Sequence, residues 1–293
     1  MRHESRYNDP MPVRLIALDI DGTLLDSRWQ LPEANRAAIV EAASRGVEVA
    51  LVTGRRYDFA MPIARQLECP LTMIASNGAV IRTSDGVTHL QHLLPRVTAR
   101  QILASTKDWR EDAAVIFDRP GEKQLIVEAV NRDDVIRAGY FERNREYIDV
   151  VVPLESCLTT DPVQVMFWGR IDRMRAVESV LRTSDFTPTV AIALTLYEAR
   201  DFAMIDVLNP ACTKGSALEE WATVRGYLRE EILAIGDNHN DAEMLQFAGI
   251  PVVMGNAVAE LKNRGWHETR CNDESGVAAA IERFVLREAP SCA

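Results

Sequence analysis

Short apolar runs alternate with helix-like stretches at both ends of the chain, and this alternation most restricts the possible folds. Near the N-terminus, strands are expected at 15–18, 47–52 and 71–75, with helices at 33–44 and 57–67. Near the C-terminus, helices are expected at 214–224, 241–248 and 276–286, with strands at 231–235 and 250–254. Short uniformly apolar runs are typical of strands buried on both faces. Strands that alternate with helices predict a parallel sheet with crossover helices, an α/β fold.

The middle of the chain, from about residue 83 to 200, is richer in strand-like runs. Five such runs are AAVIF, QLIVEAV, YIDVVVPL, VQVMFW and TVAIALTLY, and helices are expected at about 97–107 and 171–183. This pattern predicts a separate α+β domain inserted into a discontinuous α/β domain. The expected segments are 1–82 and 201–293 for the α/β domain and 83–200 for the insert, with residues 1–12 as a frayed tail.

Composition excludes several classes of protein. The 293 residues carry a formal net charge of −10 and contain no basic run of the kind that binds nucleic acid. Five scattered cysteines, at 69, 157, 212, 271 and 292, form no C-x-x-C pair, which favours a reduced protein without a zinc site. No apolar run approaches the roughly 20 residues of a membrane span. We therefore expect a cytoplasmic protein, monomer or homodimer, that binds neither nucleic acid nor membranes.

Two carboxylates follow the first predicted strand, in the segment IALDIDGTLLDS at 16–27. If the strand continues to Asp21, the side chains of Asp19 and Asp21 point to the same side. Like charges at that spacing raise each other's pKa unless a cation lies between them. The alternative is an ordinary turn at Asp21-Gly22, with Asp19 as a cap.

Further polar residues stand at the ends of other predicted core elements. They are Thr53, Gly54 and Arg55 after the strand at 47–52, Lys214 at the start of a helix, and Asp237, Asn240 and Asp241 after the strand at 231–235. Taken singly, Thr53 could be a helix N-cap, Lys214 a solvated surface residue and Asp237 part of a turn. Ligands bind at the carboxyl ends of strands in such sheets, so we expect these residues to converge on one site.

The residue types in this set point to phosphoryl chemistry. Clustered carboxylates call for a hard divalent cation, and oxygen ligands favour Mg²⁺. A hydroxyl, an ammonium and backbone N–H groups suit phosphate oxygens. One carboxylate can attack phosphorus and form an aspartyl-phosphate, while a second can pass a proton to the leaving group and later activate water. Two aspartates facing one substrate and one metal would serve these two roles.

The order of these motifs resembles that of the haloacid dehalogenase-like hydrolase superfamily, and more narrowly of its Cof-type Mg²⁺-dependent phosphatases. The matching segments are LDIDGTLL at 18–25, VTGR at 52–55, SNGA at 76–79, TKGSAL at 213–218 and IGDNHND at 235–241, with softer matches at 252–262 and 275–284. Two departures are Ser275, where the family usually has an acidic residue, and NRGW at 263–266. The resemblance implies a Rossmann-like doubly wound parallel-sheet core with an inserted α+β cap domain of type C2.

The resemblance also implies a role for each matching residue. Asp19 would be the nucleophile and a metal ligand, and Asp21 the general acid/base with its backbone carbonyl on Mg²⁺. Thr53 and Lys214 would hold the transferring phosphoryl group. The remaining metal residues would be Asp237 and Asp241, and the residues near the substrate would be Gly54, Arg55, Asn77, Gly78 and Asn240. Possible lid residues in the cap are Trp168, Arg170, Tyr197 and Arg200, for which a core or surface role is equally open.

Three functions remain open from the sequence. The first is a phosphatase that acts on a small phosphorylated metabolite such as a sugar phosphate, or a flavin or pyridoxal phosphate. The second is a sugar phosphomutase, which needs basic cap residues to hold a second phosphate; candidates are Arg132, Arg137, Arg143, Arg145, Arg170, Arg173 and Arg175. The third is a non-enzymatic protein that binds or senses phosphate, against which the complete catalytic set argues.

Overall fold

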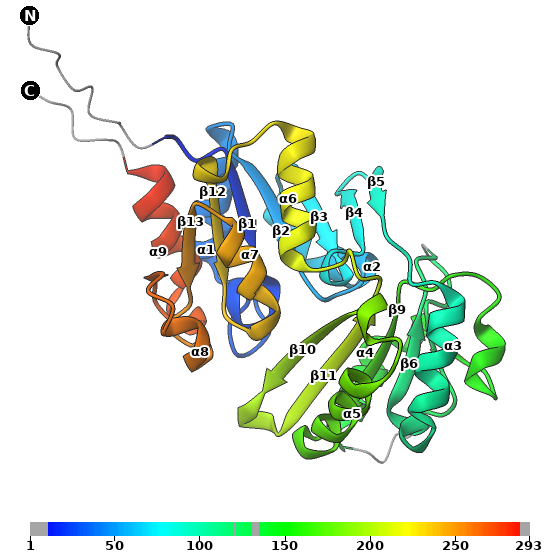
Figure 1. Ribbon diagram of the computed structural model, residues 1–293. Coiled ribbons are helices and arrows are strands. Elements are labelled where there is room, and N and C mark those ends of the chain that lie inside the picture. Colours follow the sequence, from blue (N-terminus) through cyan, green and yellow to red (C-terminus); the bar gives the residue numbers. More distant parts are fainter. Residues whose placement is uncertain (1–10, 120, 131–134, 288–293) are drawn as a thin grey trace, which may run out of the picture.

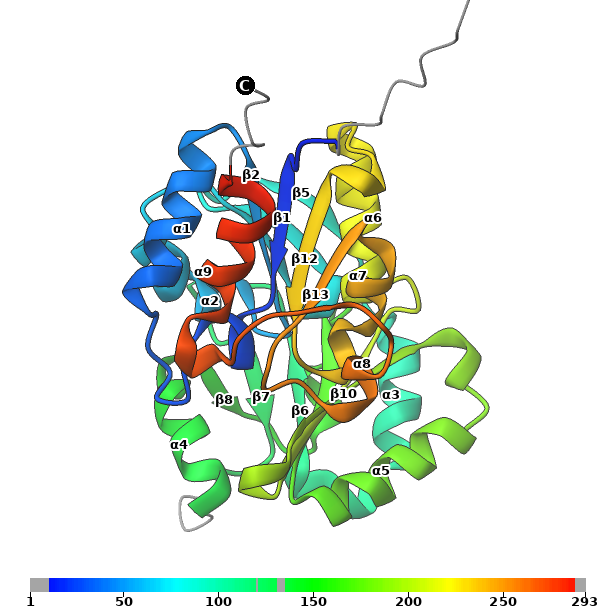
Figure 2. The ribbon, with the colours of Figure 1, turned by 90° about the vertical axis from the view of Figure 1, so that its left-hand side faces the viewer.

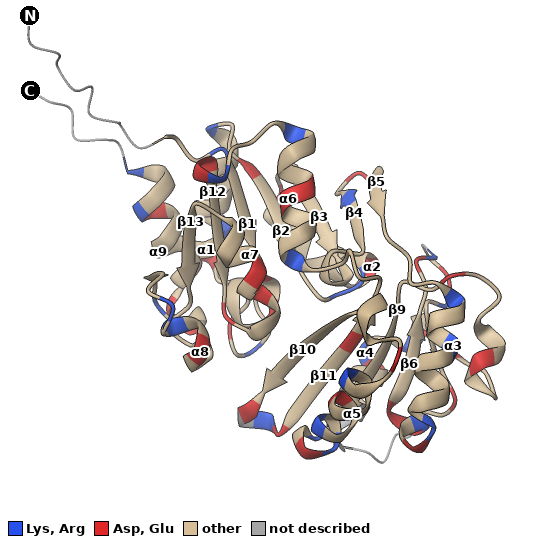
Figure 3. Cartoon of the chain, viewed as in Figure 1, with Lys and Arg blue, Asp and Glu red and all other residues tan. Residues whose placement is uncertain are grey.

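The computed structural model describes residues 11–119, 121–130 and 135–287, and it contains two sheets in two domains (Figure 1). Most of the expected N-terminal tail, residues 1–10, lies outside the described residues, as does Arg132. None of the helices described is long and apolar enough to cross a membrane. Acidic and basic residues are interspersed over both domains (Figure 3).

The core domain contains an eight-stranded sheet in the order β14-β13-β12-β1-β2-β3-β4-β5. Its strands are β1 Leu15–Leu18, β2 Glu48–Val52, β3 Thr72–Ala75, β4 Val80–Thr83, β5 Thr88–Gln91, β12 Ile232–Gly236, β13 Ile250–Val253 and β14 His267–Glu268. Neighbouring strands from β14 to β3 are parallel, and β4 runs antiparallel to both of its neighbours, β3 and β5. β1 and β12 are the central strands and are wholly buried, as their uniformly apolar sequences predict.

Helices cover both faces of the core sheet, as a doubly wound fold requires. Those labelled in Figure 2 are α1 Glu33–Ser44, α2 Tyr57–Ala64 and α9 Gly276–Ile281 on one side of the sheet, with α6 Lys214–Arg225 and α7 Ala242–Phe247 on the other. A short helix, α8 Ala259–Lys262, follows β13. This confirms the predicted α/β core with a parallel sheet.

The second domain contains a six-stranded sheet in the order β10-β11-β9-β6-β7-β8, antiparallel except between β7 and β8. Its strands are β6 Ala113–Ile116, β7 Leu125–Val127, β8 Ile148–Val150, β9 Gln164–Gly169, β10 Ala191–Tyr197 and β11 Phe202–Leu208, and its helices are α3 Arg96–Ser105, α4 Val135–Arg143 and α5 Ile171–Thr183. The sequence predicted an α+β insert but identified neither β11 nor α4. We call this domain the cap.

Two strands join a different domain from the one to which the expected segment boundaries would assign them. β5 extends the core sheet beyond residue 82, and β11 belongs to the cap sheet although it starts after residue 200. The chain therefore leaves the core sheet after Gln91 and leaves the cap sheet after Leu208. Strand pairing decides these boundaries, because among the described residues β5 pairs with β4 of the core sheet, and β11 lies between β9 and β10 of the cap sheet.

The two faces of the cap sheet have different partners because side chains alternate along each strand. On β9 and β11, Val165, Phe167, Ile205 and Val207 pack in one apolar cluster with residues of α3 and α5. The alternate residues Gln164, Met166, Met204 and Asp206 line a cavity between the cap and the core. The polar pair among them, Gln164 and Asp206, is therefore directed at the core.

Candidate active site

Lys214 is the first residue of α6 and is 2% exposed. Its Nζ donates hydrogen bonds to Asp19 Oδ1 and to Asp241 Oδ1, both at 2.6 Å. Burial by itself lowers the pKa of Lys214, but the Asp19 and Asp241 carboxylates outweigh burial and raise it. Lys214 is therefore a buried ammonium that joins three segments of the core, which excludes the alternative of a solvated surface lysine.

Asp237 is buried and follows β12. Its Oδ1 accepts a hydrogen bond from Thr23 Oγ1 at 2.8 Å. Burial raises the pKa of Asp237 well above its usual value, and the charges of Asp19 and Asp241 raise it further. Gly22 leaves space for this carboxylate, because a Cβ at Gly22 would lie 2.4 Å from Asp237 Oδ2.

Asp241 is fully buried, and nearby backbone N–H groups hold its carboxylate. Its Oδ2 accepts hydrogen bonds from the backbone N–H groups of Asp237 and Asn238, both at 2.9 Å. The short helical turn His239–Asp241 therefore folds back on the end of β12 and presents the remaining oxygen, Oδ1, to Lys214.

These three aspartates form a cluster that fits a divalent cation. One oxygen from each of Asp19, Asp237 and Asp241 lies within 4.8 Å of the others. Burial raises the pKa of Asp19 to about 7, with Lys214 opposing and Asp241 and Asp21 adding to the rise. Three buried carboxylates beside one ammonium leave two negative charges without compensation. Hard oxygen ligands and this excess of negative charge are the properties of a Mg²⁺ site.

Asp21 does not join this cluster through its side chain. Its two carboxylate oxygens accept hydrogen bonds from Arg55, at 2.7 Å from Nε and 2.5 Å from Nη2, in a two-point ion pair. The strand does not continue to Asp21, since β1 ends at Leu18, as predicted, and the chain turns at Gly22 with φ +89°. Asp19 and Asp21 nevertheless face one cavity, because the turn places both on its wall.

The loop after β2 places Thr53 and Gly54 close to the loop after β3. Thr53 is fully buried, and its Oγ1 accepts a hydrogen bond from the backbone N–H of Arg55 at 3.1 Å. It is not the cap of α2, whose N-cap is Arg56. A Cβ at Gly54 would lie 3.3 Å from the Asn77 amide, so the glycine allows these loops to approach.

Asn77 and Gly78 connect the core site to its surroundings rather than lining the cavity. Asn77 donates from Nδ2 to Asp206 Oδ2 at 2.7 Å, and its Oδ1 accepts from Asn240 Nδ2 at 3.0 Å. Gly78 has φ +98°, and a Cβ there would lie 2.4 Å from the backbone oxygen of Thr213. Gly78 thus permits the close packing that places the start of α6, and with it Lys214.

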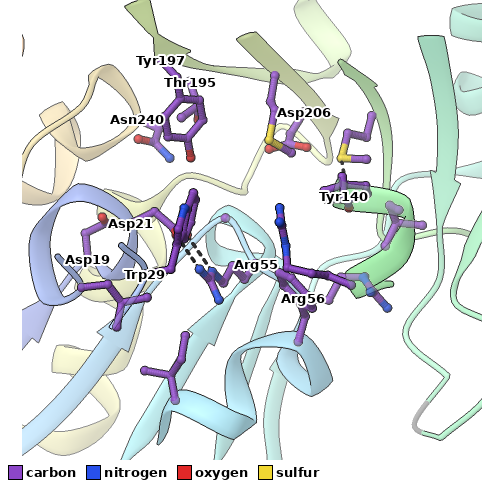
Figure 4. A pocket seen from close by; sticks show the side chains of 18 of the residues that line it. Asp19, Asp21, Trp29, Arg55, Arg56, Tyr140, Thr195, Tyr197, Asp206 and Asn240 are labelled. Atoms are coloured by element: carbon purple, nitrogen blue, oxygen red, sulfur yellow. Dashed lines mark hydrogen bonds and ion pairs between the residues drawn. The ribbon is translucent and has the colours of Figure 1, made fainter. Parts of the chain in front are cut away.

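The cavity between core and cap has a volume of about 690 Å³. Of the predicted residues, Asp19, Asp21, Gly54, Arg55 and Asn240 line it directly. Figure 4 shows Asp19, Asp21, Arg55 and Arg56 on the core side, facing Thr195, Tyr197 and Asp206 of the cap. Thr53, Lys214, Asp237 and Asp241 are not on its wall. Asp237 and Asp241 belong to the carboxylate cluster, and Lys214 is bonded to it.

The predicted lid residues fall into two pairs. Tyr197 and Arg200 line the cavity, and burial, followed by the charges of Asp21 and Asp19, raises the pKa of Tyr197 well above its usual value. Trp168 is a buried residue of the cap core, and Arg170 is exposed and paired with Asp201. Tyr197 and Arg200 are therefore the two that can contact a bound molecule.

Most of the basic cap residues considered for a second phosphate lie away from the cavity. Arg173 pairs with Glu111 and Asp112, and Arg175 pairs with Glu178 on the same helix. Arg145 is exposed and is not on the cavity wall, and the side chain of Arg137 lies outside the described residues. Of the seven candidates, only Arg143 is seen to line the cavity.

Two polar residues of the site were given no role from the sequence, Asp206 in no motif and Asn238 within IGDNHND. Asp206 is buried on β11, where burial raises its pKa to about 7 and where it accepts hydrogen bonds from Asn77 and from Gln164 Nε2 at 2.6 Å. Asn238 is tied to β10, since its Nδ2 donates to Leu196 O at 2.9 Å and its Oδ1 accepts from Leu196 N at 3.4 Å. The available signal for Asp206 was one acidic residue in the apolar run AMIDVL.

Aromatic residues of the wall were also missed. Trp29, which has φ +63°, has the guanidinium groups of Arg55, Arg143 and Arg200 within 5.5, 5.7 and 5.1 Å of its ring centre. Phe59 and Tyr140 line the cavity as well. No local pattern in the sequence distinguishes these aromatic residues from core residues.

Comparison with known proteins agrees with the fold and with the motifs. A family model described as haloacid dehalogenase-like hydrolase matches residues 16–281. Phosphatase YwpJ of Bacillus subtilis is 29% identical over 295 residues, covering 93% of this chain and 100% of that protein. HMP-PP phosphatase of Serratia proteamaculans is 29% identical over 250 residues, covering 85% of this chain and 86% of that protein.

A solved structure gives the same result. The crystal structure of a haloacid dehalogenase-like hydrolase from Bacteroides thetaiotaomicron superposes with a TM-score of 0.76 at 25% identity, covering 92% of this chain and 99% of that one. The resemblance read from the motifs, including that to the Cof-type group, and the predicted fold are therefore confirmed. The match over nearly the whole length establishes that the chain belongs to the haloacid dehalogenase-like hydrolases and is an enzyme of that family.

Proposed function

We propose that the protein is a Mg²⁺-dependent phosphatase that hydrolyses phosphate monoesters of small metabolites through an aspartyl-phosphate on Asp19. The observation that carries the proposal is the position of Asp19, which lies on the cavity wall and also belongs to the buried carboxylate cluster bound to Lys214. A nucleophile for phosphoryl transfer needs both features, because it must reach the substrate and have positive charge beside it. The relatives named as phosphatases support this reaction class.

In this proposal Asp19 attacks phosphorus with its free oxygen. Its Oδ1 is bound to Lys214, which holds the carboxylate in one orientation and reduces its repulsion of an anionic substrate. The bond between phosphorus and the ester oxygen breaks as the bond to Asp19 forms. Water then attacks phosphorus, which releases phosphate and regenerates the carboxylate.

Asp21 is the residue placed to move the proton. It lies two residues from Asp19 on the same cavity wall and is oriented by the ion pair with Arg55. Phosphoryl oxygens compete for the same guanidinium N–H groups, because arginine binds carboxylate and phosphate with equal geometric fit. Binding of the substrate to Arg55 would release Asp21 to carry the proton to the leaving oxygen and later to take one from water.

The residues that would hold Mg²⁺ are Asp19, Asp237 and Asp241, with the backbone carbonyl of Asp21 as a further ligand. When bound, the cation supplies positive charge for the phosphoryl oxygens and compensates the buried carboxylates. Thr23 holds the carboxylate of Asp237, and Lys214 together with the backbone N–H groups of Asp237 and Asn238 holds that of Asp241.

The cavity supports a small substrate. Its walls come from both domains, and about 690 Å³ accommodates a metabolite but not a protein or a nucleic acid. The aromatic residues Trp29, Phe59 and Tyr140 suit the apolar faces of a sugar or a planar ring. We infer that the cap side of the cavity selects the leaving group while the core side performs the chemistry.

The test is phosphate release from a panel of sugar, nucleotide, flavin and pyridoxal phosphates, with Mg²⁺ and with EDTA. We expect release that needs Mg²⁺ and that falls by at least about 10³-fold in Asp19→Asn, because the amide cannot attack phosphorus. Asp149→Asn makes the same chemical change on an exposed cap strand and should leave the rate unaltered. Equal rates in Asp19→Asn and wild type would contradict the nucleophile, and release in EDTA would contradict the metal requirement.

A further inference from the structure

Arg56 is a buried cation that has only uncharged hydrogen-bond partners. It is 7% exposed and lines the cavity next to Arg55 (Figure 4). Its Nη1 donates to Gln124 Oε1 at 2.6 Å, and its Nη2 donates to Asn144 Oδ1. Both acceptors are amide oxygens of the cap. No carboxylate of the described residues forms an ion pair with Arg56, whereas Arg55 has such a pair with Asp21.

The nearby carboxylates have other partners or positions. Asp58 lies in the same wall, but its Oδ2 accepts from Gln124 Nε2 at 2.5 Å and from the backbone N–H of Gly121 at 3.2 Å. Gln124 therefore stands between Asp58 and Arg56 and bonds to both. Glu146 also lines the cavity and makes no ion pair with Arg56. The guanidinium is instead stacked near the Tyr147 ring, 4.8 Å from its centre.

This environment is unfavourable for the charge of Arg56. Burial lowers the pKa of Arg56, and the opposing contributions of Tyr140, Tyr147 and Asp58 do not restore it. Buried charges in proteins are normally paired, because an unpaired charge in a region of low polarity has a high free energy. An anion in the cavity beside Arg56 would remove this cost.

Arg143 gives the same wall a second guanidinium. It belongs to α4, lines the cavity and makes no ion pair with a described residue. Burial, and then the charge of Arg55, lowers the pKa of Arg143. Three cavity arginines, Arg56 of the core and Arg143 and Arg200 of the cap, are thus without a carboxylate partner among the described residues. The hydrogen bond of Arg200 goes to the backbone oxygen of Ser27 at 3.5 Å.

We propose that Arg56 provides a second anion site in the cavity, with further positive charge from Arg143 on the same wall, so that the substrate is a phosphate monoester with a carboxylate or a further phosphate at its other end. The inference rests on the proposed phosphatase function, since it assigns the two ends of one cavity to the two ends of one substrate. Guanidinium groups bind carboxylate and phosphate oxygens through paired N–H groups, so both anions meet the same chemistry. The unused N–H groups of Arg56 are the donors for this second anion.

A purely structural role for Arg56 makes a different prediction. Arg56 comes from the core, and Gln124 and Asn144 come from the cap, so the residue also joins the two domains. If joining the domains were its only role, replacing it would change the rates for charged and uncharged substrates alike. The ratio of these rates is therefore the informative quantity, because a displaced cap affects both rates.

The experiment uses pairs of substrates that differ only in charge. Each pair is an ω-carboxyalkyl phosphate and its primary amide, which have nearly the same shape, in a series of increasing chain length. We expect kcat/KM of the wild-type enzyme to favour the carboxylate by about 10-fold or more at the best length, as for a hydrogen bond to a charged group. Alkane bisphosphates of the same chain lengths then distinguish the two anions. A kcat/KM above that of the carboxylates indicates a second phosphate, and a lower one indicates a carboxylate.

Variants connect the preference to the two arginines. Arg56→Gln should reduce the carboxylate-to-amide ratio to about 1, Arg143→Gln should reduce it in part, and Arg56→Lys, which keeps the charge, should retain part of it. Arg175→Gln removes a cap arginine that is paired on the exterior and should not change the ratio. A wild-type ratio near 1 at every length, or an unchanged ratio in Arg56→Gln, would overturn the second anion site.

Failure of the phosphatase function would look different. If the wild-type enzyme releases phosphate from neither member of any pair, the proposed reaction is contradicted. Isothermal titration of the Asp19→Asn protein with each pair then still decides the second anion site, because the carboxylate should bind about 10-fold more tightly than the amide. Equal affinities would overturn it.

Discussion

The core side and the cap side of the cavity place their functional residues by different means. On the core side, Asp19, Arg55 and Asp237 stand in loops that directly follow strands of a parallel sheet, so the end of each strand positions them. On the cap side, Gln164, Met166 and Asp206 stand within antiparallel strands, and the alternation of side chains directs them at the core. Strand ends thus place the residues proposed for the chemistry, and one face of a sheet places the cap residues that line the cavity.

The two sides also differ in charge. The core side concentrates three buried carboxylates and one ammonium in one cluster, so the stability of the cluster depends on positive charge that compensates the carboxylates. The cap side has Asp206 as its buried carboxylate, and both partners of this group are uncharged amides. Substitutions in the core should therefore act through the loss of a counter-ion, and the substitution of Asp206 in the cap through its pH dependence.

The largest effect is expected for Lys214→Met. Removal of the ammonium leaves Asp19 and Asp241 buried without a counter-ion, which costs roughly 3–5 kcal/mol of the free energy of unfolding. Turnover should be lost, and Mg²⁺ should raise the melting temperature of the variant more than that of the wild type, because the cation replaces the missing charge. Differential scanning calorimetry with and without Mg²⁺ measures this shift in melting temperature.

Lys123→Met, on the exposed surface of the cap, is the control. Equal Mg²⁺ shifts in the wild type, Lys214→Met and Lys123→Met would contradict the charge argument.

A smaller effect is expected when the core side is altered by shape alone. Gly22 and Gly46 have φ +89° and +86°, so alanine at either position costs about 1–2 kcal/mol. At Gly22 the added Cβ would also lie 2.4 Å from Asp237 Oδ2, whereas at Gly46 it would meet nothing within 4 Å. Gly22→Ala should therefore weaken Mg²⁺ binding by about 10-fold or more, and Gly46→Ala should not. Isothermal titration with Mg²⁺ separates the two, and equal affinities would show that the Gly22 contact does not position Asp237.

On the cap side, Asp206→Asn tests the buried carboxylate through pH. Burial raises the pKa of Asp206 in the folded protein to about 7, against about 3.9 in an unfolded chain. Between these values the folded state holds a proton that the unfolded state has lost, so the contribution of Asp206 to stability falls as pH rises from about 4 to about 7. Asparagine does not titrate. The free energy of unfolding of the wild type, minus that of the variant, should therefore fall by up to about 4 kcal/mol across this range.

Urea denaturation at a series of pH values provides this measurement. A constant difference between the proteins would reflect only the changed hydrogen bonds to Asn77 and Gln164, so the slope with pH carries the test. Asp149→Asn, at an exposed cap carboxylate, controls for the removal of one acidic group. Parallel curves for wild type and Asp206→Asn would mean that Asp206 is ionised throughout.

The smallest effect is expected for Arg170→Ala on the exterior of the cap. Arg170 and its partner Asp201 have side chains that are 63% and 45% exposed, so their ion pair contributes at most about 1 kcal/mol. Neither kcat/KM nor the melting temperature should change appreciably. A loss of activity comparable to that of a cavity variant would place Arg170 in the lid after all.

The core and its chemistry could be predicted from the sequence because the relevant information is local. The bounds of β1 and α1 agree with the expected ranges, and each predicted charged residue of the core stands within a few residues of a buried strand or a helix start. Lys214 is the clearest example, since its position at the start of α6 is a property of its own segment. The possible continuation of the strand to Asp21 is not realised, because the chain turns at Gly22.

The cap side could not be predicted in this way because its residues meet only in three dimensions. Asp206 was missed because the strand that carries it was not identified. Arg56 directly follows the VTGR motif, but its role depends on its hydrogen bonds to Gln124 and Asn144, which are 68 and 88 residues away in sequence. The face of the cap sheet toward the core cannot be chosen until the packing of α3 and α5 on the other face is known.

Asn238 stands next to Asp237 and is bonded to both the N–H and the C=O of Leu196, as a neighbouring strand would be. The side chain of Asn238 thus joins β10 to the loop that carries Asp237 and Asp241, the proposed metal ligands. A movement of the cap that separates β10 from this loop would have to break both hydrogen bonds of Asn238. The position of β10 at the cavity would therefore be coupled to the position of the loop that carries Asp237.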